Sequence, residues 1–210
     1  MIVVLFLILL TIVALHFGKF VRKHHIKLYT GLSVLSIVAF IFKDATLTIP
    51  IMQGFLGLSF FYLVMITGAL KKTSKIRVKL MGVRREYSIL GFIAIAPHAL
   101  NYTIQGLDGT RQLEWFGLIA FVLMIPLFVT SFISIRKKMK VKTWNLLQSA
   151  AYIIYILLFI HLILNYTKTI NLVLYLVIFI FYFVMKSIYE INKYKEKKLK
   201  KAIRSAELAH

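Results

Sequence analysis

Apolar runs of membrane length, separated by short charged segments, repeat along the sequence and limit the folds open to it. The run 144–166 reads WNLLQSAAYIIYILLFIHLILNY and carries one ionisable residue besides tyrosine, His161. About 20 apolar residues cross a bilayer, and backbone groups in lipid must form hydrogen bonds within their own segment. With 60% hydrophobic and 16% charged residues, the chain is expected to be an all-α polytopic membrane bundle. A membrane barrel would instead need short alternating strands.

Seven apolar runs are expected to cross the membrane as helices. Pro50 opens the third run, where its fixed φ suits the first turn of a helix. Pro97 is expected to kink the fourth run and Pro126 to break the fifth. The second run is the shortest, with 15 residues. The runs cover residues 1–18, 28–42, 49–70, 87–104, 115–135, 144–165 and 170–185.

The distribution of basic residues predicts the orientation of these helices. Of the 27 lysines and arginines, 24 fall on one side, in segments 19–27, 71–86, 136–143 and 186–210; Lys43, Arg111 and Lys168 fall on the other. Cytoplasmic loops are rich in Lys and Arg, so the N-terminus is expected outside and the C-terminus in the cytoplasm. The first run is interpreted as a retained span, since no basic residue precedes it and no clear cleavage site follows it.

Composition also excludes several functions. The net charge of +20 does not indicate nucleic-acid binding, because the basic residues are confined to loops and the tail. Cysteine is absent, which excludes disulfides, thiolate metal sites, iron–sulfur clusters and covalent haem attachment. No glycine-rich phosphate loop and no soluble domain are found, so nicotinamide or flavin chemistry would reside on another chain.

His98 and His161 are the ionisable residues, tyrosines aside, that lie well inside the expected hydrocarbon. At 1.5 Å per residue, they lie about 9 Å and about 6 Å from the outer ends of two parallel helices. Two imidazoles at similar depth match the axial ligands of a bis-histidine haem b, which suits electron transfer. A membrane histidine can also simply form a hydrogen bond across a helix interface, and the residues alone leave both interpretations open.

The surroundings of each histidine fit a flat macrocycle in part. Small or slender side chains are expected on the His98 face, where they would allow close approach. Polar residues follow each histidine and are expected to meet haem propionates at the outer surface. The small or slender residues are Gly91, Ala94 and Ile95. The polar residues are Asn101 and Tyr102 after His98, Asn165 and Tyr166 after His161, and Arg111 from the loop 105–114.

Three segments resemble parts of a known family. GFLGLSFFYLVMITGALKKTSK resembles a helix that ends in a basic loop, and VRREYSILGFIAIAPHALNY resembles a segment with an arginine pair, Leu-Gly and a first haem histidine. LIAFVLMIPLFVTSFISIRKKMKVKTWNLLQSAAYIIYILLFIHLIL resembles a Thr-Ser span end, a basic loop, a Trp and a helix with a second haem histidine. Residues 53–164 thus resemble the ferric reductase-like transmembrane family, most closely its short MsrQ (YedZ) type.

The resemblance implies a haem-binding core at 49–185, for which six helices would suffice. N-terminal membrane helices at 1–48 precede it and a basic cytoplasmic tail at 186–210 follows it. His98 and His161 would be the haem iron ligands, and no residue is expected to be a catalytic acid or base. Electrons would come from quinol or a cytoplasmic flavin reductase, with quinone, FMN or FAD at the cytoplasmic side. The acceptor would be extracytoplasmic: a methionine sulfoxide reductase partner, another flavoprotein or ferric iron. The setting would be a bacterial cell membrane.

The sequence departs from the family pattern at one informative position. The family usually has Leu-His-Arg thirteen residues before its last histidine, whereas this chain has Leu147-Gln148-Ser149. An amide is a poor haem ligand, so one haem is expected, in the outer half of the membrane. Gln148 also leaves open a family member that has lost its cofactor.

Two further interpretations complete the sequence-based expectations. His24 and His25 lie in a basic loop and are expected to be solvated, because two adjacent histidines lack further metal ligands; His16 lies near the inner end of the first run. The alternative function is a haem-free helical membrane protein, such as a small transporter or an assembly factor. Paired acidic residues inside the spans would favour a proton-coupled transporter, and the sequence has none.

Overall fold

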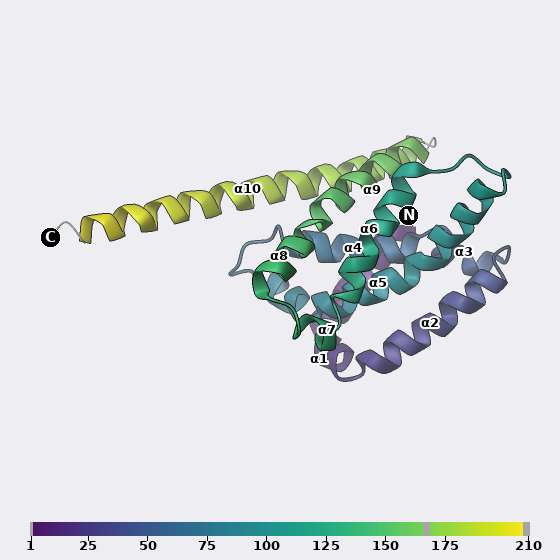
Figure 1. The fold of residues 1–210 in the computed structure, drawn as a ribbon, viewed down its shortest axis with the longest axis horizontal. Coiled ribbons are helices and arrows are strands. Elements are labelled where there is room, and N and C mark those ends of the chain that lie inside the picture. Colours follow the sequence, from purple (N-terminus) through teal and green to yellow (C-terminus); the bar gives the residue numbers. More distant parts are fainter. Residues whose placement is uncertain (1, 166–168, 208–210) are drawn as a thin grey trace.

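The computed structural model describes residues 2–165 and 169–207, and every regular element in this part of the chain is a helix (Figure 1). The all-helical class is therefore confirmed. The elements are α1 (Ile2–Lys23), α2 (His25–Ile41), the 3-10 turn η1 (Thr46–Thr48), α3 (Ile49–Met52), α4 (Phe55–Thr67), α5 (Lys75–Leu107), α6 (Trp115–Val129), α7 (Ile133–Arg136), α8 (Val141–Ser149), α9 (Ala151–Asn165) and α10 (Thr169–Glu207).

By length and composition, four helical stretches in the described residues are long and apolar enough to cross a membrane. They are Ile2–Lys23, Thr46–Thr67, Val141–Asn165 and Ile170–Ser205. The apolar helices α2 and α6 are shorter. α5 has 33 residues, but its first turns are basic.

α4 forms the centre of the bundle. Every residue from Gly57 to Thr67 is buried, because α1, α5 and α10 pack around this helix. Its buried hydroxyls bond to carbonyls one turn back: Ser59 donates to Phe55 O at 2.8 Å and Thr67 to Leu63 O. A largely apolar helix whose hydroxyls are hydrogen-bonded is suited to an interior position.

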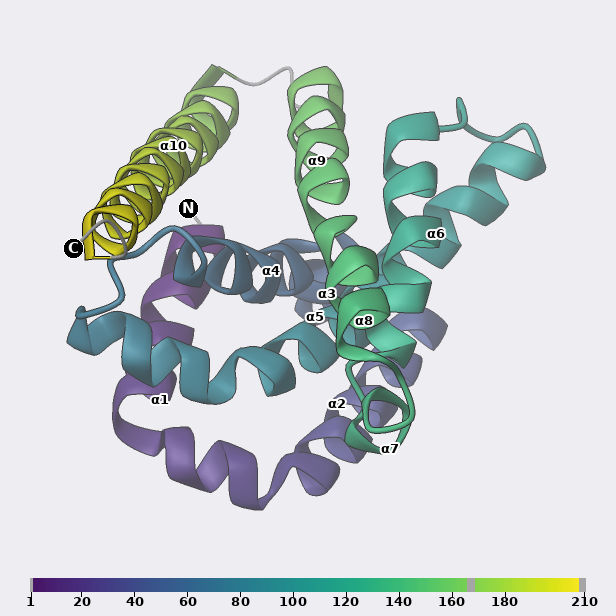
Figure 2. The same cartoon turned by 60° about the vertical axis from the view of Figure 1, so that its left-hand side comes forward.

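α6 and α9 pack against each other on one flank of this centre, as both ribbon views show (Figures 1 and 2). α10 joins the bundle through its first half, where Phe179 stacks on Phe159 of α9 with centroids 5.3 Å apart. Tyr62 of α4 donates its hydroxyl to Ile178 O of α10 at 3.1 Å. α10 continues to Glu207, and its second half extends beyond the bundle (Figure 1).

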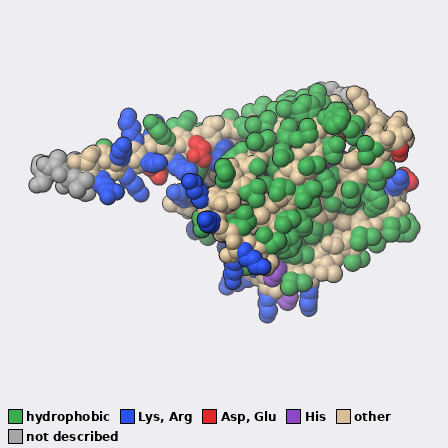
Figure 3. Space-filling model, in the orientation of Figure 1, with side chains coloured by type: hydrophobic (Ala, Val, Ile, Leu, Met, Phe, Trp, Pro, Cys, Tyr) green, Lys and Arg blue, Asp and Glu red, His purple; other side chains and the backbone are tan. Residues whose placement is uncertain are grey.

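The surface separates apolar from basic side chains. Figure 3 shows hydrophobic side chains over the broad face, with Lys and Arg gathered at one end and along the projecting part of α10. Large apolar side chains such as Leu5, Val34 and Ile156 are at least half exposed. An exposed apolar band of this kind is suited to contact with lipid rather than water.

Helix boundaries differ from the sequence-based expectation at several points. The expected helix 49–70 is interrupted at Gln53 and Gly54, and Gly54 has a φ of +72°. The fifth run continues through Pro126 and ends at Val129, and the sixth is interrupted at Ala150. Most of the expected basic loop 71–86 belongs to α5, which continues through the expected kink position to Leu107. These breaks set the positions of side chains in the cavity described next.

Candidate functional site

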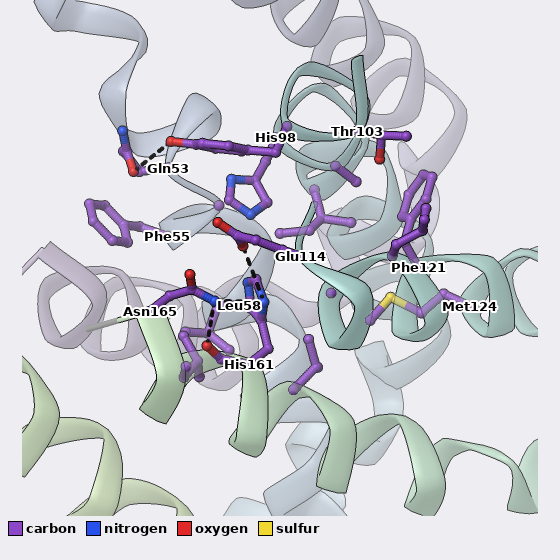
Figure 4. Close-up of a pocket in the computed structure, with 18 of the residues that line it drawn as sticks. Gln53, Phe55, Leu58, His98, Thr103, Glu114, Phe121, Met124, His161 and Asn165 are labelled. Atoms are coloured by element: carbon purple, nitrogen blue, oxygen red, sulfur yellow. Dashed lines mark hydrogen bonds and ion pairs between the residues drawn. The ribbon is translucent and has the colours of Figure 1, made fainter. Parts of the chain in front are cut away.

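A cavity of about 160 Å³ lies among α4, α5, α6 and α9, and both predicted histidines line it (Figure 4). His98 comes from α5 and His161 from α9. Their ring centroids are 6.3 Å apart and their planes meet at 76°. The structure thus brings together the two residues that were expected to lie at similar depth.

The interruption between α3 and α4 holds His98 in place. The short helix α3 ends with the carbonyl of Met52 directed at His98, whose Nδ1 lies 2.9 Å from that oxygen. A carbonyl only accepts, so Nδ1 carries the proton and Nε2 keeps a free lone pair. The chain then turns at Gly54, where a Cβ would lie 2.8 Å from Ile95 and 3.2 Å from the His98 ring. Glycine is therefore required for both the positive φ and the close approach.

His161 is held by a carboxylate from the start of α6. Its Nδ1 lies 3.4 Å from Glu114 Oε2, and the two side chains are 12% and 19% exposed. Asn165, one turn later, donates to His161 O at 2.9 Å and lies 3.2 Å from Nδ1. The Glu114 carboxylate can only accept a proton from Nδ1, whereas the Asn165 amide nitrogen can only donate to it, so these two contacts do not assign one tautomer to His161. The ring lies against Gly117, where a Cβ would be 2.8 Å from His161 Cε1.

Polar side chains connect this pair to the surface. Arg111 is 45% exposed, binds Glu114 Oε1 at 2.9 Å and lies 4.4 Å from the centre of the Tyr102 ring. Tyr102 in turn donates to Gln53 Oε1 at 3.3 Å. In the loop before Arg111, the hydroxyl and the amide of Thr110 donate to Asp108 and lower the pKa of its carboxyl. The cavity therefore has a charged, hydrogen-bonded mouth and largely apolar walls.

The separation of the two imidazoles is similar to that of the two axial ligands of a haem. A metal–imidazole bond is about 2 Å long and the ring centroid lies about 1 Å behind its nitrogen, so axial imidazoles have centroids about 6 Å apart. The observed separation is 6.3 Å, and each histidine has its Nδ1 engaged by polar groups. In the described residues, no group of three or more His, Cys, Asp or Glu side chains could hold a metal ion. A bis-histidine haem needs only two axial ligands from the protein.

The other residues expected near the histidines divide into two groups. Ile95, Tyr102, Arg111 and Asn165 line the cavity. Gly91 instead serves the contact of α5 with α4, since a Cβ there would lie 3.0 Å from Phe60 Cβ. The remaining expected residues lie elsewhere: Ala94 is fully buried, Asn101 accepts a hydrogen bond from Gln105, and Tyr166 lies outside the described residues.

Sequence reasoning missed three groups that shape the site: Glu114, Gly117 and the carbonyl of Met52. Glu114 had a usable signal, because it is one of only seven acidic residues and directly precedes an apolar run. Gly117 and the Met52 carbonyl had none, since their roles depend on which helices become neighbours.

A second, smaller cavity of about 40 Å³ shares Phe61 and Met124 with the first. Gln148 lines it, together with Arg84 and Tyr155. Gln148 also donates to Thr130 Oγ1 at 3.3 Å. No histidine lines this cavity. Gln148, at the position where the ferric reductase-like family usually has a histidine, contributes a hydrogen-bonded amide instead.

Glu86, which the sequence placed in a basic loop, is buried. Its side chain is 2% exposed and forms an ion pair with the neighbouring Arg85. This carboxylate is an ionisable group inside the fold that the sequence-based account of the histidine pair left out.

Three histidines, His16, His24 and His25, lie in the N-terminal helices and the turn between them, away from the cavity. His25 places Nδ1 2.8 Å from Arg22 O, and His24 contacts the Phe20 ring with centroids 4.5 Å apart. His16 is exposed on α1. All three contact α1 or its connection to α2 and none lines the histidine cavity.

Comparisons with known proteins add little to the site. An uncharacterized protein of Treponema pallidum (strain Nichols) is 29% identical over 170 residues, covering 71% of this chain. The match covers 46% of that protein, so the chain spans less than half of its relative. No family model and no solved structure matches the chain. The likeness to the ferric reductase-like family therefore stays a prediction from the sequence.

Proposed function

We propose that this chain is a haem b membrane subunit that carries electrons from the inner to the outer side of a bacterial cell membrane. The observation that carries the proposal is the 6.3 Å separation of the His98 and His161 rings beside the cavity. Haem iron held by two imidazoles has no open position for a substrate, so the group would supply one-electron transfer.

The residues of this chain have distinct tasks in that function. The Met52 carbonyl would fix the tautomer of His98, since it takes the proton of Nδ1, and Glu114 would hold the His161 ring in place. Apolar walls exclude water, and Arg111 offers a cation to carboxylate groups at the mouth of the cavity. One site is proposed per chain, because the smaller cavity presents Gln148 where a further ligand would be needed.

The proposed topology has seven spans, with the N-terminus outside and the C-terminus in the cytoplasm. The shorter helices α2 and α6, together with α5, would join the four long apolar stretches as spans. This arrangement places the cavity mouth outside and the basic segments inside, in accord with the positive-inside tendency. Quinol or a flavin reductase is the proposed donor, and an extracytoplasmic reductase, flavoprotein or ferric iron the proposed acceptor.

An absorption spectrum of the purified protein tests the proposal. A reduced haem b band is expected at one haem per chain, and it should be lost in both His98→Ala and His161→Ala. His16→Ala is the matched control, because this histidine lies on the exposed face of α1, and it should keep the band. A colourless protein from haem-replete cells would refute the proposal, and two haems per chain would refute the single site.

A further inference from the structure

α10 keeps one exposed apolar stripe from its membrane-length half into the part that extends beyond the bundle (Figure 1). Eight exposed apolar side chains, four from each half, fall within about a third of the helix circumference at 3.6 residues per turn. Each of them is close to half exposed or more. In the first half they are Val173, Val177, Phe181 and Val184, and in the second Ile188, Ile191, Leu199 and Ile203.

The opposite face of α10 changes character along the helix. Tyr175, Phe179 and Tyr182 are buried there against the bundle. Beyond Tyr182 the same face is basic, and Figure 3 shows Lys and Arg along this projecting part. Residues 186–210 hold eight Lys or Arg and three Glu. The face that packs on the bundle therefore continues as a row of cations, formed by Lys186, Lys193, Lys197, Lys200 and Arg204.

The projecting helix is thus amphipathic, and a membrane surface with anionic headgroups fits both of its faces. α10 has 39 residues, about 58 Å at 1.5 Å per residue, whereas a bilayer core is roughly 30 Å thick. Its second half therefore lies beyond the hydrocarbon when its first half crosses it. Apolar side chains of such a helix enter the boundary between headgroups and acyl chains, and its cations meet phosphates. Lys195 and Lys198 lie in or beside the stripe, where long side chains extend their ammonium groups to that level.

The continuity of the stripe determines how the tail reaches this surface. Within the membrane the stripe faces away from the bundle, toward lipid. A bend near Lys186 in that direction turns the same stripe toward the plane of the membrane surface, without rotation about the helix axis. The bend opens some backbone hydrogen bonds, whereas burial of the stripe and contact of the cations with anionic lipid are both favourable. A second copy of the helix is a poorer partner, because it would bring eight further cations close to these.

We propose that residues 188–204 are a surface anchor, an amphipathic helix that bends away from the bundle and lies on the anionic inner surface of the membrane with its apolar stripe toward the lipid. This inference goes beyond the proposed electron transfer and rests only on the proposed topology of α10, not on haem. The anchor weakens at high salt, because ions screen the attraction between its cations and the headgroups.

Fluorescent labels on single cysteines test the anchor in the full chain, which has no cysteine of its own. The protein is placed, one copy per disc, in lipid nanodiscs of phosphatidylcholine alone or mixed with phosphatidylglycerol. A nitrobenzoxadiazole label at Leu199→Cys, on the stripe, should shift its emission to the blue and resist quenching by iodide in the anionic discs but not in the neutral ones. At Lys197→Cys, on the opposite face, the label should stay open to iodide in both, which also controls for repulsion of iodide by anionic lipid.

A charge-removal pair tests the role of the cations. Lys195→Gln with Lys198→Gln should weaken the surface-bound state of the tail, read from the label at position 199, by about fivefold for each removed charge. Lys137→Gln with Lys138→Gln is the matched control, because these exposed lysines lie in another basic segment of the same side, and it should leave the label protected. Equal losses in both pairs would show a general charge effect and overturn the anchor.

Val177→Cys separates the anchor from the topology on which it rests. Its label, on the lipid-facing stripe of the first half, should be protected in every disc. Quenching there would mean that α10 does not cross the membrane, and the proposed topology would fall with the anchor. Protection at position 177 with quenching at position 199 in anionic discs would mean that the tail projects into water, which overturns the anchor alone. Equal protection at position 199 in neutral discs, or protection only in discs that hold two copies, would also overturn it. The haem band, measured on the same samples, reports on the proposed electron transfer independently.

Discussion

At the residue scale, the position of the His161 ring depends on the absence of a side chain at Gly117. The α6 backbone comes so close that a Cβ at Gly117 would lie 2.8 Å from His161 Cε1 and 2.9 Å from Nδ1. Such distances are shorter than real carbon contacts, so the ring would have to move. The contact with Glu114 depends on the same ring position, and Gly117 therefore supports both the ligand and its partner.

Gly117→Ala is expected to reduce the free energy of unfolding by about 1–3 kcal/mol, the usual range for overpacking. Gly31→Ala is the control, because it lies in α2 with nothing within 4 Å of the added Cβ. Alanine there should be neutral or stabilising by up to about 1 kcal/mol, since it favours helix over glycine. Thermal unfolding in detergent measures both variants. Equal stability of the two would contradict the close approach of α6 to His161.

At the element scale, the interruption between α3 and α4 delivers the Met52 carbonyl to His98. Gly54→Ala is expected to destabilise the fold by about 1–2 kcal/mol through its left-handed backbone. The contact with Ile95 should lower the free energy of unfolding of this variant further, because the added Cβ would lie 2.8 Å from Ile95 Cδ1. Gly109→Ala has the same backbone strain, with a φ of +78°, but nothing within 4 Å. Thermal unfolding measures the loss of stability in Gly54→Ala and in Gly109→Ala, and the difference between them isolates the packing contribution at Gly54. Equal losses would contradict the close contact between Gly54 and Ile95.

The same interruption shows how far the sequence determines elements. Apolar runs located the helices because a membrane-length run has few alternatives to a helix. They did not locate the breaks at Gly54 and Ala150, because a single glycine or alanine inside an apolar run carries no strong local signal. Helix depth along the membrane was enough to pair His98 with His161. It could not identify Glu114, since lateral neighbours depend on how α5, α6 and α9 pack.

At the scale of the whole molecule, the separation of charges gives the bundle two different ends. Arg111 lines the histidine cavity, and the α2–α3 and α5–α6 connections lie at one end of the bundle, whereas the second half of α10 projects from the other end (Figure 1). Lys and Arg side chains gather along that projecting part and at the adjoining end of the bundle (Figure 3). Under the proposed function, electrons would enter at the basic end and pass the smaller cavity on their way to the histidine pair. The shared wall of the two cavities, Phe61 and Met124, lies on that route.

This two-ended arrangement predicts which positions a reagent can reach from outside. The chain has no cysteine, so single cysteines can be introduced without a background signal. Leu47→Cys lies at the cavity end and is 94% exposed, and a membrane-impermeant maleimide should label it in intact cells. Thr73→Cys and Ser205→Cys lie in exposed basic segments and should react only after the membrane is permeabilised. Labelling of both Leu47→Cys and Thr73→Cys in intact cells would mean that 49–70 does not cross the membrane. Since α4 lies within that segment and carries the wall of the histidine cavity, such a result would also remove the reason to place that cavity at the outer side.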